Sequence, residues 1–218
     1  MKKGDFLWLA VLLILVSILL IPETKEWFIL ITDKYKYPGG FVKFAILATM
    51  GDMLGLRILK GEWEKPKGLL YKILIWGLIG MMVTLAFPVC IAGSLFAQNA
   101  GLLPFDGSKI AMAFFASVMM NLTFGPMMMT FHRFTDMYID SLYDKNTLKL
   151  NELISKNDWH SLVEFTWLKA CPFFWIPAHT IVFLLPQEYR VITSAFLSIA
   201  LGILLAVSKK KKSNASKK

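Results

Sequence analysis

The chain of 218 residues is 56% hydrophobic and only 18% charged, with a formal net charge of +9. Soluble domains carry about a quarter charged residues, so this composition argues against an ordinary soluble protein. The positive charge does not indicate nucleic-acid binding, because the lysines cluster beside long apolar blocks, as they do in membrane proteins. The two cysteines lie singly inside apolar blocks, and this pattern predicts neither a disulfide framework nor a zinc site.

Long apolar blocks recur along the whole chain. A helix needs roughly 20 residues to cross a hydrocarbon core of about 30 Å. The predicted spans lie within residues 6–22, 41–59, 73–96, 110–134, 159–186 and 191–208. We therefore expect an all-α polytopic membrane helix bundle of about six transmembrane helices. It forms one membrane-embedded domain over residues 1–208, and a basic cytoplasmic tail follows over residues 209–218.

The first block follows a charged start and so resembles a signal peptide, but no small-residue cleavage pattern follows it. We expect a retained span. Residues 23–40 mix charged residues with aromatic ones such as Trp27 and Phe28, which predicts an interfacial segment. We expect this segment to break at Pro38-Gly39-Gly40.

The fourth span carries a polar stripe on an otherwise apolar helix. At about 100° per residue, one face collects Ser117, Asn121, Gly125, Met128, His132 and Asp136. Pro126 follows Gly125 in mid-span and should kink the helix, because proline lacks an N–H group and clashes with the preceding turn. The stripe requires a protein neighbour or water. Two readings stay open, a buried helix–helix seam and the wall of a pore or ligand cavity.

The second span contains Asp52, an acidic residue well inside an apolar block. A carboxylate at that depth is costly and should contact protein or water. It either bonds to a neighbouring helix, with Arg57 or Arg133 as candidate partners, or takes part in gating or an ion or proton site. We expect it near the end of the fourth span formed by His132 and Arg133. The spacing of Gly51 and Gly55 predicts a close helix contact on this span.

The fifth span is interrupted by Pro172 and Pro177, so we expect a second kink. His179 lies inside it, either bonded to a neighbouring helix or in a ligand or proton role. The histidines show no metal-ligand spacing, and no phosphate loop or nucleophile–base motif is present. We expect no enzyme activity, no cofactor and no metal site.

Lysine and arginine are more frequent in the segments that this arrangement places on the side of the two termini. The positive-inside rule then predicts that both termini are cytoplasmic. No Arg- and Ser-rich import segment precedes the first span, so we expect the cytoplasmic membrane of a prokaryote. Residues 135–160 are polar and predict a loop with a short amphipathic helix near the membrane surface.

Three segments together resemble a known family. They are Gly51-Asp52, Gly125-Pro126 with Asp136 after it, and Pro186-Gln187-Glu188-Tyr189-Arg190. Over residues 41–208 the chain resembles the Mpv-seventeen / peroxisomal membrane protein family of small multi-span membrane proteins. The chain departs from the family pattern at Leu56, where the family has glutamine, and at Trp175-Ile176-Pro177, where the family has adjacent Trp and Pro. The resemblance implies pore activity for small solutes.

The leading hypothesis is therefore a small-solute channel or transport-related protein in a lipid bilayer. The alternative is a non-transporting bundle with a structural, partner-binding or lipid-binding role. Residues expected in a pore or polar core are Asp52, Asn121, Gly125, Pro126, His132, Arg133, Asp136 and His179. A single polar cavity that touches Asp52, Asn121 and His132 favours the first hypothesis, and a dry methionine-packed seam favours the second.

Overall fold

The computed structural model describes residues 2–145 and 147–215, and every regular element in this part of the chain is a helix. The helices are α1 (Lys3–Leu20), α2 (Pro22–Lys34), α3 (Lys36–Lys60), α4 (Leu69–Asn99), α5 (Lys109–Leu122), α6 (Phe124–Tyr143), α7 (Leu150–Lys156), the π-helix η1 (Ser161–Trp175), α8 (Ile176–Leu184) and α9 (Gln187–Ala215). The all-α prediction is confirmed. The predicted tail begins inside α9, whose backbone stays helical to Ala215, and residues 216–218 lie outside the described part.

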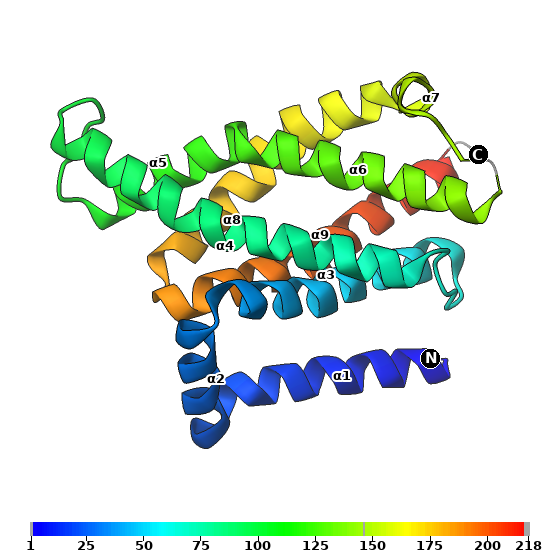
Figure 1. Ribbon diagram of the computed structural model, residues 1–218, viewed down its shortest axis with the longest axis horizontal. Helices are drawn as coiled ribbons and strands as arrows, with labels where there is room; N and C mark the ends of the chain where they lie inside the picture. Colours follow the sequence, from blue (N-terminus) through cyan, green and yellow to red (C-terminus); the bar gives the residue numbers. More distant parts are fainter. Residues whose placement is uncertain (1, 146, 216–218) are drawn as a thin grey trace.

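Most helices run along the long axis of the molecule and alternate in direction (Figure 1). These are α1, α3, α4, the α5–α6 pair, the η1–α8 pair and α9. α2 crosses one end of the bundle, and the short α7 lies at the other. Because of the alternation, α1 begins at the same end of the bundle at which α9 finishes.

The centre of the bundle is α3, whose largest contacts are with α9 and α4. Both contacts are close because glycines meet there. A Cβ atom added to Gly202 would lie 2.8 Å from the Gly51 carbonyl oxygen, and one added to Gly40 would lie 2.8 Å from the Gly80 carbonyl oxygen. The close approach predicted at Gly51 is confirmed. It lets α3 and α9 pack backbone to backbone.

The predicted kink site of the fourth span is a helix boundary. α5 ends at Leu122, and Thr123 lies between the helices with φ −116° and ψ −72°. Pro126 falls in the first turn of α6, where a missing N–H group costs no helical hydrogen bond. The bend angle at this boundary stays a prediction, as does the kink of the fifth span, where η1 contains Pro172 and passes directly into α8.

Two predicted boundaries are wrong. The chain does not break at Pro38-Gly39-Gly40, because these residues lie in the first turns of α3 and the break is at Tyr35, with φ −121° and ψ 62°. The predicted loop over residues 135–160 begins later, because α6 continues to Tyr143. The short helix predicted within that loop is confirmed as α7.

Four helical stretches of the described chain are long and apolar enough to cross a membrane: Lys3–Leu20, Leu69–Asn99, Lys109–Tyr143 and Ser161–Leu184. The predicted spans at 41–59 and 191–208 correspond to α3 and α9, which are not among these four. α3 carries Lys43, Asp52 and Arg57 within its length.

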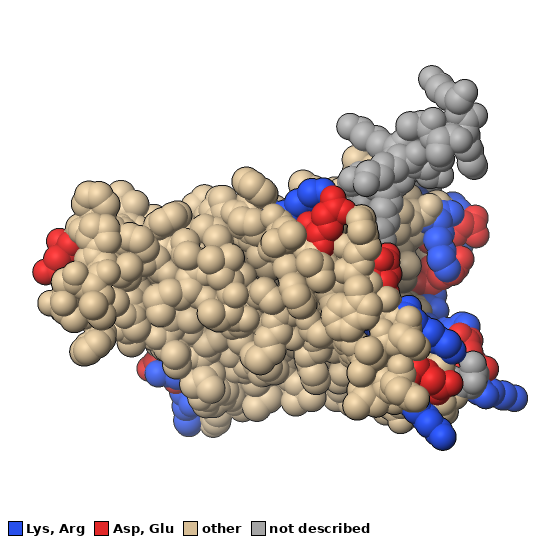
Figure 2. Space-filling model, turned by 90° about the horizontal axis from the view of Figure 1, so that it is seen from above, with Lys and Arg blue, Asp and Glu red and all other residues tan. Residues whose placement is uncertain are grey.

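Charged side chains gather mostly at the end where α1 begins, and the middle of the face in Figure 2 is almost free of them. Ion pairs join Lys2 to Glu62 and Lys67 to Asp144. All four side chains are about half exposed or more, so these pairs contribute little to stability.

Candidate functional site

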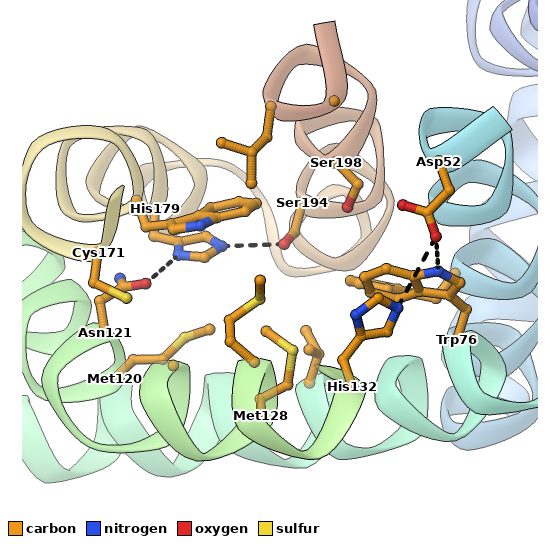
Figure 3. Close-up of a pocket in the computed structure, with 17 residues that line it drawn as sticks. Asp52, Trp76, Met120, Asn121, Met128, His132, Cys171, His179, Ser194 and Ser198 are labelled. Carbon is orange, nitrogen blue, oxygen red and sulfur yellow. Dashed lines mark hydrogen bonds and ion pairs between the residues drawn. The ribbon is translucent and has the colours of Figure 1, made fainter. Parts of the chain in front are cut away.

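A cavity of about 190 Å³ lies inside the bundle, between α3, α4, α5, α6, η1, α8 and α9. Its wall holds polar groups at two separated places, with sulfur-containing side chains between them (Figure 3). We call these places the Asp52 cluster, formed by Asp52, Trp76 and His132, and the His179 network, formed by His179, Asn121 and Ser194. Ser117, which does not line the cavity, bonds to Asn121 and belongs to the same network.

The Asp52 cluster joins three helices. Trp76 of α4 donates a hydrogen bond from Nε1 to Oδ2 of Asp52, at 2.7 Å. His132 of α6 places Nε2 3.9 Å from the same carboxylate oxygen, which is too long for a direct hydrogen bond. The Trp76 and His132 rings lie against each other, with centroids 4.1 Å apart. Asp52 is therefore held at one oxygen by an indole that itself contacts the histidine ring, with the two rings tilted by 36°.

Hydrogen bonding of the Asp52 carboxylate is incomplete. A carboxylate has about four acceptor positions, but among the described residues only Trp76 donates a hydrogen bond to it. The side chain is 44% exposed in the isolated chain, compared with 14% for His132. The free positions therefore have room for water or another donor.

The backbone of α3 fixes where Asp52 points. Its neighbour Gly51 packs against the α9 backbone, with an added Cβ atom only 3.0 Å from the Ser198 carbonyl oxygen. Successive helical residues are about 100° apart, so Asp52 cannot share that contact and lies beside it. There its side chain lines the cavity together with Ser198 of α9.

The His179 network is buried and fully bonded. Ring atom Nδ1 of His179 lies 3.2 Å from Oδ1 of Asn121, and Nε2 lies 3.1 Å from the Ser194 hydroxyl. The Asn121 amide donates to the Ser117 carbonyl oxygen at 2.8 Å, and the Ser117 hydroxyl donates to the Ile176 carbonyl oxygen at 2.8 Å. The network thus ties α5, α8 and α9 together.

These contacts determine the tautomer of His179. Because the amide nitrogen of Asn121 donates to Ser117, its Oδ1 faces the imidazole and can only accept. Nδ1 therefore carries the proton, and Nε2 accepts from the Ser194 hydroxyl. The ring also stacks on Trp175 at a centroid distance of 5.0 Å and an angle of 16°. A neutral, doubly bonded and stacked imidazole is suited to a structural role.

Between the two polar places the cavity wall is soft and apolar. Met128 lies there, and Met120 lies between it and Asn121 (Figure 3). Methionine side chains adapt their shape easily, because they are unbranched and have three rotatable bonds. These side chains can change conformation around a small bound molecule more readily than the hydrogen-bonded side chains at the two polar places can.

Five of the predicted site residues lie on the cavity wall: Asp52, Asn121, Gly125, His132 and His179. The remaining three do not line it. Pro126 lies in the first turn of α6, Arg133 bonds through Nε to Oδ1 of Asn157 at 3.4 Å, and Asp136 lies 3.5 Å from the Lys72 ammonium.

The expected position of Asp52 within reach of His132 is confirmed by their 3.9 Å separation, although His132 lies in the middle of α6 because this helix continues to Tyr143. Neither proposed arginine is the partner of Asp52. Arg57 instead pairs with Asp5 of α1, with Nε 2.9 Å from Oδ1. Arg133 bonds instead to Asn157, and neither residue lines the cavity.

Sequence reasoning missed Trp76, Ser194 and Ser198. The two serines are four residues apart on α9 and therefore share a helix face, which is a readable signal. Trp76 gave no such signal, because tryptophan in an apolar span is compatible with simple packing. Its role depends on Asp52, which lies 24 residues earlier in the chain.

Within residues 2–145 and 147–215, no three His, Cys, Asp or Glu side chains are grouped to hold a metal ion. Comparison with known proteins adds no relative, since no family model, no curated protein and no solved structure matches the chain.

Proposed function

We propose that this chain is a multi-pass membrane protein that passes small polar solutes through the bundle by way of the cavity. The observation that carries the proposal is that Asp52, Asn121 and His132, from three different helices, line one and the same cavity. Polar groups at membrane depth are costly unless they meet protein or water, and here they meet a common space. The resemblance to the Mpv-seventeen / peroxisomal membrane protein family points to the same kind of activity.

The proposed arrangement has about six spans, with α3 and α9 added to the four stretches of membrane length. It is supported by the alternation of direction and by the charge at the end where α1 begins. By the positive-inside rule that end is cytoplasmic, in the cytoplasmic membrane of a prokaryote. A reporter fused within residues 147–157 should then signal cytoplasm, and one at Asp106 the outside. A cytoplasmic signal at Asp106 contradicts this topology.

The size of the cavity sets the class of solute. At about 30 Å³ for each water molecule, 190 Å³ holds about six waters. The solute is therefore a molecule of a few heavy atoms. The methionine side chains of the wall are the part most able to move during passage, because they are unbranched and flexible.

A non-transporting bundle is the second candidate. The complete bonding of the His179 network favours it, because a permanently closed network seals that end of the cavity. In this alternative the cavity holds resident water that satisfies Asp52 and has no route across.

Flux measurements in liposomes test the proposal. The purified chain is reconstituted and the swelling of vesicles is followed with glycerol, erythritol and sucrose. We expect glycerol to pass faster than in protein-free vesicles and sucrose to be excluded. Equal rates with and without the protein for every solute contradict the transport proposal and favour the sealed bundle.

A further inference from the structure

A second hollow lies outside the bundle core, where α1 and α2 meet α3. Its volume is about 600 Å³, and its lining is almost entirely apolar, including Leu15, Trp27, Ile31 and Ile46. We call it the α1–α3 groove. The hollow is separate from the cavity, since no residue lines both.

The polar contacts that anchor α1 to the rest of the bundle lie near its beginning, and apolar side chains such as Leu15 and Leu19 pack against the core further along. Asp5 accepts hydrogen bonds from Arg57 and Trp63, at 2.9 and 2.7 Å, and Trp8 donates to the Met50 carbonyl oxygen at 3.0 Å. No residue of α1 is buried. Toward its other end α1 leads into α2, and the space between them and α3 stays open at the surface.

One cation lines this apolar groove. Lys43 of α3 is only 9% exposed, and its ammonium group donates to the Thr32 hydroxyl at 3.0 Å. The ammonium also lies 4.7 Å from the centre of the Phe28 ring. Among the described residues no carboxylate forms an ion pair with Lys43, whereas Lys36, about two helix turns earlier, pairs with Asp33 at 3.5 Å.

A buried ammonium without a counter-charge is costly and selects for an anion. It has three donor positions, and the Thr32 hydroxyl uses one of them. The remaining donors are available to an oxygen anion beside a long apolar surface. The chemistry that fits both features is a hydrocarbon chain with a carboxylate at its end.

We propose that the α1–α3 groove binds one long-chain fatty acid, with its carboxylate on Lys43 and its chain against α1, α2 and α3. The volume favours one chain over a two-chain lipid. Taking about 30 Å³ for a group the size of water, 600 Å³ accommodates about 20 groups, the size of one fatty acid.

Native mass spectrometry of the intact chain in a nonionic detergent tests this inference, with oleate and oleyl alcohol as probes. The two differ only in the head group. We expect one oleate per chain, held about tenfold more tightly than oleyl alcohol, because the carboxylate adds a charge-assisted hydrogen bond. Lys43→Met should remove that preference. The matched control Lys36→Met, which removes an exposed lysine at the same end of α3, should keep it.

Equal binding of oleate and oleyl alcohol to the unmodified chain overturns the proposal, and this comparison holds even if Lys43→Met does not fold. Tighter binding of phosphatidylglycerol than of oleate also overturns it in favour of a two-chain lipid. Dibromostearate locates the site, because bromine quenches nearby tryptophan and Trp27 lines the groove. Quenching that is undiminished in Trp27→Phe places the acid elsewhere and contradicts the assignment.

Discussion

The two polar places on the cavity wall each contain a histidine and differ in how completely their polar groups are hydrogen-bonded. In the His179 network, both imidazole nitrogens, the asparagine amide and two serine hydroxyls have partners inside the protein. In the Asp52 cluster, a carboxylate receives one hydrogen bond from Trp76, and the nearest histidine nitrogen stands off at 3.9 Å. A histidine in an apolar helix therefore indicates a function only where it has hydrogen-bonding positions that the protein does not fill. His179 has none.

This difference predicts which substitutions act on stability and which act on function. A buried group with a complete set of partners leaves several unpaired groups behind when it is removed. A partly exposed group with free hydrogen-bonding positions leaves few unpaired groups behind when it is removed. The substitutions below run from the largest expected effect to the smallest.

Asn121→Ala should cost the most. It removes the partner of His179 Nδ1 and the donor to Ser117 together, and it leaves a small void between α5 and α8. We expect a loss of about 3 kcal/mol in the free energy of unfolding, measured by SDS titration of the purified chain. Ser194→Ala is the matched milder variant, because it removes only the hydroxyl at Nε2. Equal stability of Asn121→Ala and the unmodified chain means that the network is not structural.

Gly202→Leu tests the packing that places Asp52 beside the cavity. An added Cβ atom would lie 2.8 Å from the Gly51 carbonyl oxygen, so α3 and α9 must separate. We expect about 2 kcal/mol of destabilisation, typical of overpacking, in the same titration. Gly55→Leu is the control on the same contact, where an added Cβ has 3.6 Å to the nearest atom, and it should cost less. The reverse order contradicts the contact.

Trp76→Phe tests the Asp52 cluster, the incompletely bonded one of the two polar places. Phenylalanine keeps a ring against His132 but removes the one direct hydrogen bond to Asp52. We expect a loss of about 1 kcal/mol, because the exposed carboxylate can replace the indole with water. The rate of solute flux should change clearly, whereas the free energy of unfolding should change little. A stability loss as large as that of Asn121→Ala would show that the two places do not differ.

How much of this arrangement is readable from the sequence depends on the range of the interaction. The polar stripe of the fourth span follows from helical periodicity alone, and Asn121, Gly125 and His132 do line the cavity. Asp136 belongs to the same stripe, but it lies one helix turn beyond His132 on α6, where its carboxylate is 3.5 Å from the Lys72 ammonium of α4. Helical periodicity predicts which residues share a face of a helix. It does not predict which neighbouring helix each of those residues contacts along the length of that face.

The helix boundaries show the same limit. Pro126 marks the correct region, but the break falls at Thr123, because a proline in the first turn of a new helix is cheaper than one in mid-helix. Pro38 is misleading for the same reason, since it lies in the first turn of α3. Trp76 could not be assigned from the sequence, because tryptophan in an apolar span is compatible with simple packing and its hydrogen-bond partner Asp52 is on another helix.

The most direct test of the transport claim combines flux and stability for Asp52→Asn. Asparagine keeps an acceptor for Trp76 and removes the charge from the cavity wall. We expect the stability of the bundle to change by less than about 1 kcal/mol, as for other partly exposed groups, while glycerol flux in liposomes changes severalfold. Ser194→Ala, at the bonded end, should show the opposite pattern. Unchanged flux together with a marked loss of stability in Asp52→Asn would contradict the proposal that the Asp52 cluster serves a passing solute.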